Sequence, residues 1–224
     1  GMDDRELRSF MSPRKRYLAT PRVPWVNLGF DTAGNRPLYV RVTLNREWHE
    51  GGASTDLSLY QNLKLGDATE LQLSTSRVHD QGERKYIALQ SGLPLTGLRR
   101  YTLFNQTVRL SHAFTPHLTV QVFSQWLGGN WAYRDPKVYA GDGLLAPAQA
   151  APAMAASTRV WNLSLITRWE FRPGSALFFV YSHGASTAAH VNDRGTLSPR
   201  LDLPRLSSLP SDATLQAKVS WLFR

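Results

Sequence analysis

The strongest constraint on this chain is an alternation of apolar and polar side chains with a period of two residues. In residues 38–45, Leu38, Val40, Val42 and Leu44 fall on one face of an extended segment, opposite polar side chains. No segment of comparable length shows helical spacing. The alternation predicts an all-β protein whose strands have one oily and one wet face, and it recurs with varying strength in 23–31, 57–65, 69–78, 101–113, 118–127, 160–171, 175–184 and 214–223.

The connections between these segments alternate between short and long. Turns rich in Gly, Pro, Asn and Asp occupy 32–37, 66–68, 114–117 and 172–174, whereas longer connections occupy 46–56, 79–100, 128–159 and 185–212. This places all short turns at one end of an antiparallel up-and-down meander, as in outer-membrane β-barrels. We therefore predict an outer-membrane-type β-barrel with about nine or ten strands in this chain. Residues 84–90 are interpreted as part of an extended extracellular hairpin.

The predicted strand count also bears on domain organisation. Bacterial single-chain barrels have even strand numbers, so an odd count of about nine predicts further strands upstream. Residues 1–20 are charged and lack the apolar core of a signal peptide, and Gly1 before Met2 is interpreted as a tag remnant. We expect an N-terminal segment at 1–22 and one barrel domain at 23–224, together forming the C-terminal part of a longer protein of the bacterial outer membrane.

Composition excludes several other classes. Hydrophobic residues make up 42% of the chain and the mean hydropathy is -0.32, which leaves no apolar run long enough for a membrane-spanning helix. The absence of cysteine excludes a disulfide scaffold, a thiolate metal site and a cysteine nucleophile. The net charge of +9 suggests an anionic partner, but the basic residues are scattered, so we expect no nucleic-acid binding.

Candidate functional residues follow from the predicted barrel. The wet faces of its strands would line a lumen, and outer-membrane lipid would surround the oily faces. The excess of positive charge among the wet residues favours an anionic or sugar-like solute, although a polar network filling a closed lumen would use the same residues. The predicted lumen-facing residues are Tyr39, Arg41, Asn45, Asn162, Arg168, Glu170, Gln216 and Lys218.

Motifs for catalysis or metal binding were not found in the sequence. The six histidines form no His-Glu-x-x-His motif, and Gly184-Ala185-Ser186 lacks the second glycine of a nucleophile elbow. Carboxylates are sparse, and Glu170 beside Arg168 is interpreted as an ion pair within the lumen. We therefore predict neither an enzyme nor a bound metal or cofactor.

Two sequence blocks resemble a known family. The first is Thr102-Leu103-Phe104-Asn105-Gln106-Thr107-Val108-Arg109-Leu110 followed by Phe114-Thr115-Pro116-His117-Leu118, and the second is Arg168-Trp169-Glu170-Phe171-Arg172-Pro173-Gly174-Ser175 followed by Leu177-Phe178-Phe179-Val180-Tyr181. Both resemble the C-terminal barrel domain of the family called domain of unknown function 5916. Similar proteins are long exported chains in which a family-nine carbohydrate-binding module precedes a large barrel. The resemblance implies a membrane location and a sugar-related role, and no characterised activity comes with it.

Two alternatives of a different class stay open at this point. A soluble periplasmic β-barrel or sandwich could bind a ligand in its interior, and it would use the same alternation with the oily faces turned inward. Aromatic residues cluster toward the predicted strand ends, as interfacial girdles require, but they also favour the cores of soluble sheets. The second alternative, part of a carbohydrate-active hydrolase, would need two carboxylates converging in one cleft.

Overall fold

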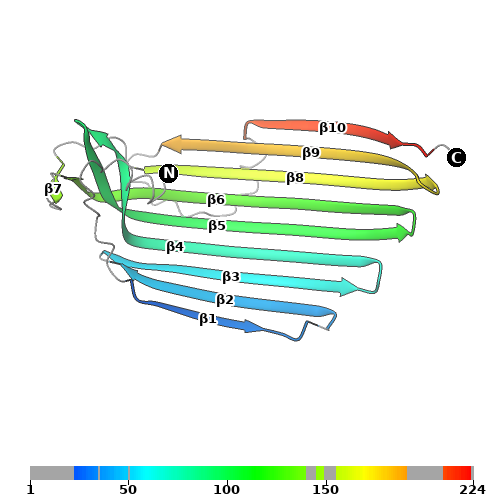
Figure 1. The fold of residues 1–224 in the computed structure, drawn as a ribbon, viewed down its shortest axis with the longest axis horizontal. Coiled ribbons are helices and arrows are strands. Elements are labelled where there is room, and N and C mark those ends of the chain that lie inside the picture. The colour runs from blue at the N-terminus through cyan, green and yellow to red at the C-terminus, as the bar shows by residue number, and fades with distance from the viewer. Residues whose placement is uncertain are drawn as a thin grey trace.

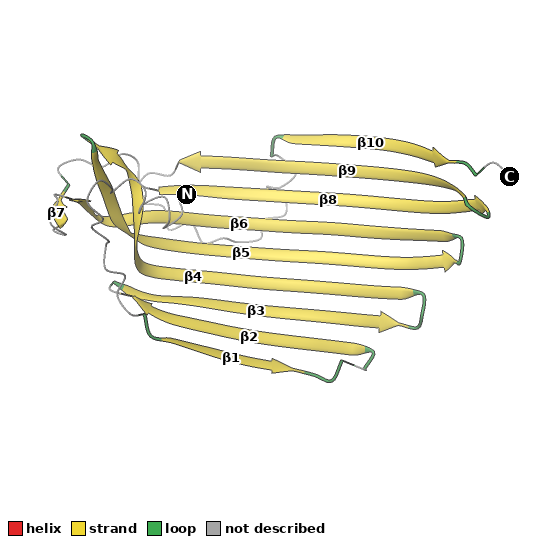
Figure 2. Cartoon of the chain, in the orientation of Figure 1, coloured by secondary structure: helices red, strands yellow, loops and turns green. Residues whose placement is uncertain are grey.

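A single antiparallel sheet accounts for the whole of the described chain (Figures 1 and 2). The computed structural model describes residues 23–34, 36–49, 51–139, 145–148, 155–190 and 209–222. The predicted segment 1–22 lies outside these residues. Among those described, no helix is long and apolar enough to cross a membrane.

The sheet contains ten strands, and successive long strands are hydrogen-bonded neighbours in the order β1-β2-β3-β4-β5-β6-β8-β9-β10, with β7 paired to β6. Every pairing is antiparallel, so the predicted all-β meander is confirmed. The strands are β1 (Trp25–Asp31), β2 (Leu38–His49), β3 (Gly52–Leu65), β4 (Thr69–Gln90), β5 (Leu93–Thr115), β6 (Leu118–Tyr139), β7 (Leu145–Pro147), β8 (Ala155–Arg172), β9 (Ser175–His190) and β10 (Ser211–Ser220).

The register of these pairings collects the alternating side chains into two faces of opposite character. Because successive side chains of a strand point to opposite sides, residues directly paired across strands share a face. We call the two sides the apolar face and the polar face, and define each by one row of paired residues. The apolar row is Leu38, Leu63, Leu71, Leu110, Val122, Leu165, Tyr181 and Leu215. The adjacent polar row is Tyr39, Asn62, Gln72, Arg109, Phe123, Ser164, Ser182 and Thr214.

All four predicted short turns lie at one end of the sheet, which we call the turn end (Figure 1). The opposite end, called here the loop end, differs from the prediction. The connections expected at 46–56 and 79–100 are not long loops, because β2 and β3 are separated only by residues 50–51, and β4 and β5 only by residues 91–92. Much of the connection expected at 128–159 is also strand, since β6 continues to Tyr139 and β8 begins at Ala155. Most of the connection expected at 185–212 lies outside the described residues.

At the loop end, β4 and β5 continue beyond the sheet and turn away from it (Figure 1). We call this part, residues 81–99 with 132–139 of β6 and β7, the extension. It confirms the extended hairpin predicted around 84–90. Its core includes Leu95, only 1% exposed, together with Thr96 and Tyr139. The bend begins at an irregularity in the β4 and β5 pairing between Gln81 and Glu83, where Gly82 has a φ of 91°.

The described sheet is open, with β1 and β10 as its edges (Figure 2). All residues of both edge strands are exposed. The predicted antiparallel up-and-down meander is confirmed, while closure into a barrel is not seen among the described strands.

Candidate functional site on the polar face

The eight predicted lumen-facing residues all lie on the polar face, as their pairing with the polar row and its neighbours shows. They form two groups rather than one site. Tyr39, Arg41 and Asn45 lie on β2, near one edge of the sheet, and the other five lie on β8 and β10. Four strands, β3 to β6, separate the two groups.

The group on β2 is connected to β1 by side-chain interactions. The Arg41 guanidinium lies 3.8 Å from an Asp31 carboxylate oxygen and 5.6 Å from the centre of the Tyr39 ring. The Tyr39 hydroxyl donates a hydrogen bond to the same carboxylate at 3.3 Å. Asn45 accepts a hydrogen bond from the Asn27 side-chain amide. Arg41 therefore contributes little uncompensated positive charge to this face.

The group on β8 and β10 contains the predicted ion pair. Arg168 donates to Glu170 at 2.7 Å, and the other carboxylate oxygen of Glu170 accepts from the Gly174 backbone amide at 3.1 Å. This confirms the pairing and explains it, because Glu170 anchors the turn before β9. Gln216 and Lys218 of β10 pair with the apolar residues Val180 and Phe178 of β9, so the polar face becomes mixed near this edge.

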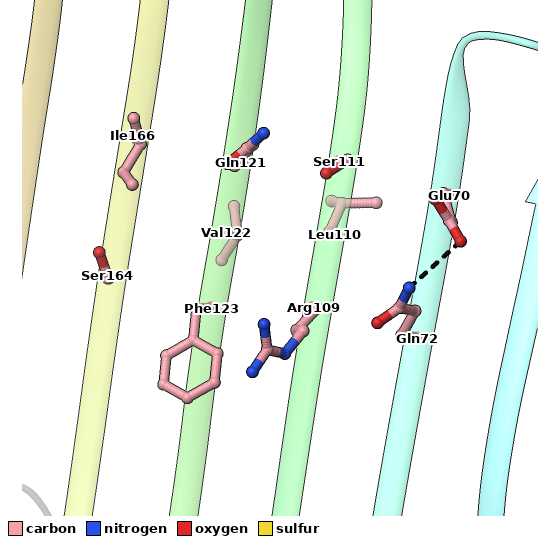
Figure 3. A pocket seen from close by; sticks show the side chains of 10 residues that line it. All are labelled: Glu70, Gln72, Arg109, Leu110, Ser111, Gln121, Val122, Phe123, Ser164 and Ile166. Atoms are coloured by element: carbon pink, nitrogen blue, oxygen red, sulfur yellow. Dashed lines mark hydrogen bonds between the residues drawn. The ribbon is translucent and has the colours of Figure 1, made fainter.

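The central strands form a pocket on the polar face that the sequence did not indicate. Figure 3 shows Arg109 beside Phe123, with its guanidinium 5.0 Å from the ring centre, and Gln72 donating to Glu70 at 3.2 Å. The cation–π contact of Arg109 and the Gln72–Glu70 hydrogen bond use only some of the polar groups of these side chains. Several of their remaining donors and acceptors are free to bind a solute at the polar face. The polar face contributes most of the lining, namely Glu70, Gln72, Arg109, Ser111, Gln121, Phe123, Ser164 and Ile166, with Leu110 and Val122 beside them.

A second polar cluster lies where the extension leaves the sheet. Asp80 is only 1% exposed, and its Oδ2 accepts hydrogen bonds from Arg99 Nε at 2.8 Å. The same guanidinium reaches Glu83 at 3.0 Å and lies over the ring of Tyr101 at 5.1 Å from its centre. Lys85 pairs with the other oxygen of Glu83 at 2.6 Å. A hydrolase would need converging carboxylates, and Asp80 and Glu83 do converge, but on Arg99, which together with Lys85 balances their charge.

Farther along the extension, ion pairs join strands that are not neighbours. Arg84 of β4 donates to the Asp135 carboxylate of β6 at 2.8 Å, and Lys137 lies 3.1 Å from the same oxygen. The Arg84 hydrogen bond, followed by that of Lys137, lowers the pKa of Asp135 from its ordinary value. Arg134 also reaches back to the Gly51 carbonyl at 2.8 Å, which connects β6 to the turn between β2 and β3. These contacts hold the extension in its bent position.

The described residues contain no arrangement that points to catalysis. In this part of the chain, no three His, Cys, Asp or Glu side chains are grouped so that they could hold a metal ion. His112 and His117, which flank the β5 to β6 turn, do not form a site: His112 Nδ1 is hydrogen-bonded to Thr69 Oγ1 at 2.7 Å and its ring packs against Phe114. The polar face is thus an extended wall of mixed donors and acceptors.

Comparison with known proteins adds one decisive observation. The family model for a domain of unknown function, DUF5916, matches residues 3–202. The chain belongs to this family. No curated protein and no solved structure matches the chain, so the DUF5916 family membership and the geometry described above are the basis for a functional proposal.

Proposed function

We propose that this DUF5916 chain forms part of the wall of an outer-membrane β-barrel, with its apolar face toward lipid and its polar face toward a lumen that admits or binds hydrophilic solutes. The observation that carries the proposal is the confinement of carboxylates to one face. Every carboxylate of the described main sheet lies on the polar face, namely Asp31, Glu47, Asp56, Glu70, Asp80, Glu170 and Asp212.

The apolar face has the properties of a surface in contact with hydrocarbon. Leu57, Trp169 and Phe179 are each 45–50% exposed there, with no second layer of the described chain covering them. Several polar side chains among them are hydrogen-bonded within the face: Thr75 donates to Gln106 at 2.6 Å, and the Trp161 indole donates to Ser124 at 3.1 Å. Such pairing is required in a bilayer, where water cannot satisfy a polar group.

The stagger of the turns supports a tilted arrangement. Leu38, the first residue of β2, shares its register row with Tyr181, which lies six residues after Ser175, the first residue of β9. The turn end thus recedes by six residues over six strand spacings. With about 3.3 Å per residue and about 4.8 Å between strands, the turns lie in one plane if the strands tilt by about 35°. Outer-membrane barrels have tilts of about 35–45°.

Aromatic residues mark two levels on the apolar face. Trp169 lies near the turn end of β8 and Trp161 lies eight residues farther along the same face. At a tilt of about 35°, eight residues correspond to a height of about 22 Å, close to the apolar band of about 25 Å between the aromatic girdles of such barrels. Trp126 pairs directly with Trp161, and the Phe171 ring packs against Trp221 with centres 5.4 Å apart.

The polar face favours a hydrophilic solute with several hydrogen-bonding groups. The central pocket combines Arg109 and Glu70 with two glutamines, two serines and the Phe123 ring, a mixture of donors and acceptors that suits a sugar-like molecule, or an anionic one held at Arg109. Two of the predicted cationic residues, Arg41 and Arg168, lie beside carboxylates, so net attraction for anions depends more on Arg109 and Lys218.

Insertion into vesicles tests the proposal. We expect the chain, folded into phosphatidylcholine vesicles, to migrate differently in gel electrophoresis with and without boiling. In variants that retain one tryptophan, lipids brominated on their acyl chains should quench Trp169 and Trp161 of the apolar face strongly and Trp131 of the polar face weakly. A chain that is monomeric without detergent, or equal quenching of Trp131 and Trp169, would favour the soluble sandwich instead.

A further inference from the structure

The apolar face carries a group of arginines at one end only. Arg46 of β2, Arg77 of β4, Arg100 of β5 and Arg159 of β8 all lie on this face, as their register positions show. We call these four residues the arginine belt. Arg46, Arg77 and Arg100 are exposed and Arg159 is half-buried. They are the charged residues of the described main strands on a face that otherwise presents mostly leucine, valine and aromatic side chains, with some uncharged polar ones.

The belt lies at and beyond the upper aromatic level. Counted from the turn end of their own strands, Arg46 and Arg77 lie eight residues in, level with Trp126 of β6. Arg77 and Arg159 share one register row through Phe104 and Gly128, two residues farther toward the loop end than the row of Trp126 and Trp161. Arg159 and Arg100 lie thirteen and fifteen residues from the turn end of their strands, beyond Trp161 at eleven. Near the turn end, by contrast, Arg172 stacks on the Trp221 ring and Arg168 is paired with Glu170.

The belt has no internal neutralisation. Within the described chain, none of its four members forms a salt bridge, and the carboxylates of the main sheet all lie on the opposite face. Arg84 and Arg134 lie nearby in the extension, but these two are engaged by Asp135 and the Gly51 carbonyl. A guanidinium binds phosphate in a bidentate manner, and its aliphatic stem can lie along an apolar surface while the charge stays at the interface.

We infer that the arginine belt binds the phosphorylated headgroups of anionic glycolipids in the leaflet at the loop end. The inference rests on the proposed function, since it takes the apolar face to be lipid-exposed. Charge complementarity supports this occupant: four cations, with no carboxylate of the main sheet on their face, lie at or beyond the upper aromatic level, where interfacial aromatic rings sit among lipid headgroups. Each basic group near an anionic membrane surface strengthens binding. Four such groups together therefore favour lipids that bear phosphate over uncharged lipids.

The test is a titration of the folded chain in zwitterionic detergent with lipid A that carries two phosphates, with bound lipid measured by native mass spectrometry. We expect retention of lipid A and little retention of its dephosphorylated form. The variant R46Q/R77Q/R100Q/R159Q should bind lipid A at least about tenfold more weakly. The matched control R41Q/K64Q/R109Q/K218Q changes the net charge equally on the polar face and should bind lipid A as the unchanged chain does.

Three results would overturn the inference. They are equal weakening in both quadruple variants, equal retention of the dephosphorylated lipid, and displacement of lipid A by inorganic phosphate at a similar concentration. Vesicle insertion distinguishes this failure from that of the proposed function. A chain that inserts into phosphatidylcholine but shows no preference for lipid A contradicts the arginine belt alone, whereas a chain that does not insert contradicts both.

Discussion

At the scale of single residues, Gly82 determines whether the extension can form. Its φ of 91° is unfavourable for any residue with a side chain, and a Cβ atom there would lie 2.1 Å from the Gly51 carbonyl carbon. We expect Gly82→Ala to lower the free energy of unfolding by at least about 3 kcal/mol, as the sum of backbone strain and overpacking. The measurement is urea unfolding in detergent.

Gly92 provides the control for this prediction. Its φ of 78° is also positive, but no atom lies within 4 Å of a Cβ placed there. Gly92→Ala should therefore show the backbone strain alone, about 1–2 kcal/mol. Equal losses in the two variants would show that the approach of Gly82 to the turn between β2 and β3 contributes nothing.

Asp135 gives the extension a dependence on pH. It lies well beyond the upper aromatic level, and Arg84 lowers its pKa, so its carboxylate stabilises the folded extension at neutral pH. Because the folded pKa lies below the unfolded one, this stabilisation is complete above the unfolded pKa and is lost as pH falls through the folded value. Asp135 is 46% exposed, so the stabilisation is small.

A carboxyl carbon titration followed by NMR measures this pKa directly. We expect a midpoint below that of an ordinary aspartate in the folded chain. Arg84→Gln should raise the midpoint more than Lys137→Gln does, following the order of the two hydrogen bonds. A midpoint that neither substitution moves would mean that these ion pairs do not form in solution.

At the scale of strands, the sequence predicts the part of each element nearest the turn end and fails at the loop end. From Thr69 to Leu73 the alternation of β4 is clear and then weakens, and the pairing with β5 shifts between Gln81 and Glu83 and again between Tyr86 and Ala88. Each shift changes which face the following residues occupy, so a period of two is lost although the chain stays extended. Because the period of two is lost and the segment is rich in charged residues, the sequence of 79–100 is typical of a loop although the chain is strand.

The candidate site, too, could be predicted only in part from the sequence. Local alternation suffices to place Tyr39 or Gln216 on the polar face, because the face depends only on neighbours in the chain. The pocket around Arg109 and Phe123 depends instead on which residues of β4, β5, β6 and β8 stand side by side, and that register is set by pairings between distant segments.

The extension is a separable element by this reasoning. Its Arg84–Asp135 ion pair and its buried Leu95 lie beyond the last pairing of β3 with β4, at Ser54 and Asp80. We expect a chain in which Asn-Gly replaces residues 82–99 to fold in detergent and to keep its heat-dependent gel mobility, because the pairs from Thr69 to Gln81 remain. Loss of that mobility change would show that the extension is needed to form the sheet.

At the scale of the whole molecule, the two open edges run in the same direction. Nine strands joined by antiparallel pairings make β1 and β10 parallel to each other. An all-antiparallel barrel therefore needs an odd number of further strands between these edges. A bilayer does not tolerate unpaired strand edges, so such strands are part of the proposed membrane structure, whichever polypeptide supplies them.

The orientation of the two faces is the property on which the whole molecule depends, and neighbouring residues of β8 can test it. Leu165 lies midway between Trp161 and Trp169 on the apolar face, whereas Ser164 lies on the polar face beside it. At the middle of a bilayer, an outward arginine costs about 2–4 kcal/mol, while a lumen substitution leaves stability largely unchanged. Leu165→Arg should therefore lower the free energy of unfolding in vesicles by about that amount, and Ser164→Arg by less than about 1 kcal/mol.

In a soluble sandwich, Leu165→Arg would be equally destabilising, but the loss of stability would be seen in the absence of lipid. The same pair of variants measured in detergent-free solution therefore separates the two structures. A stable, detergent-free Leu165→Arg chain would contradict both.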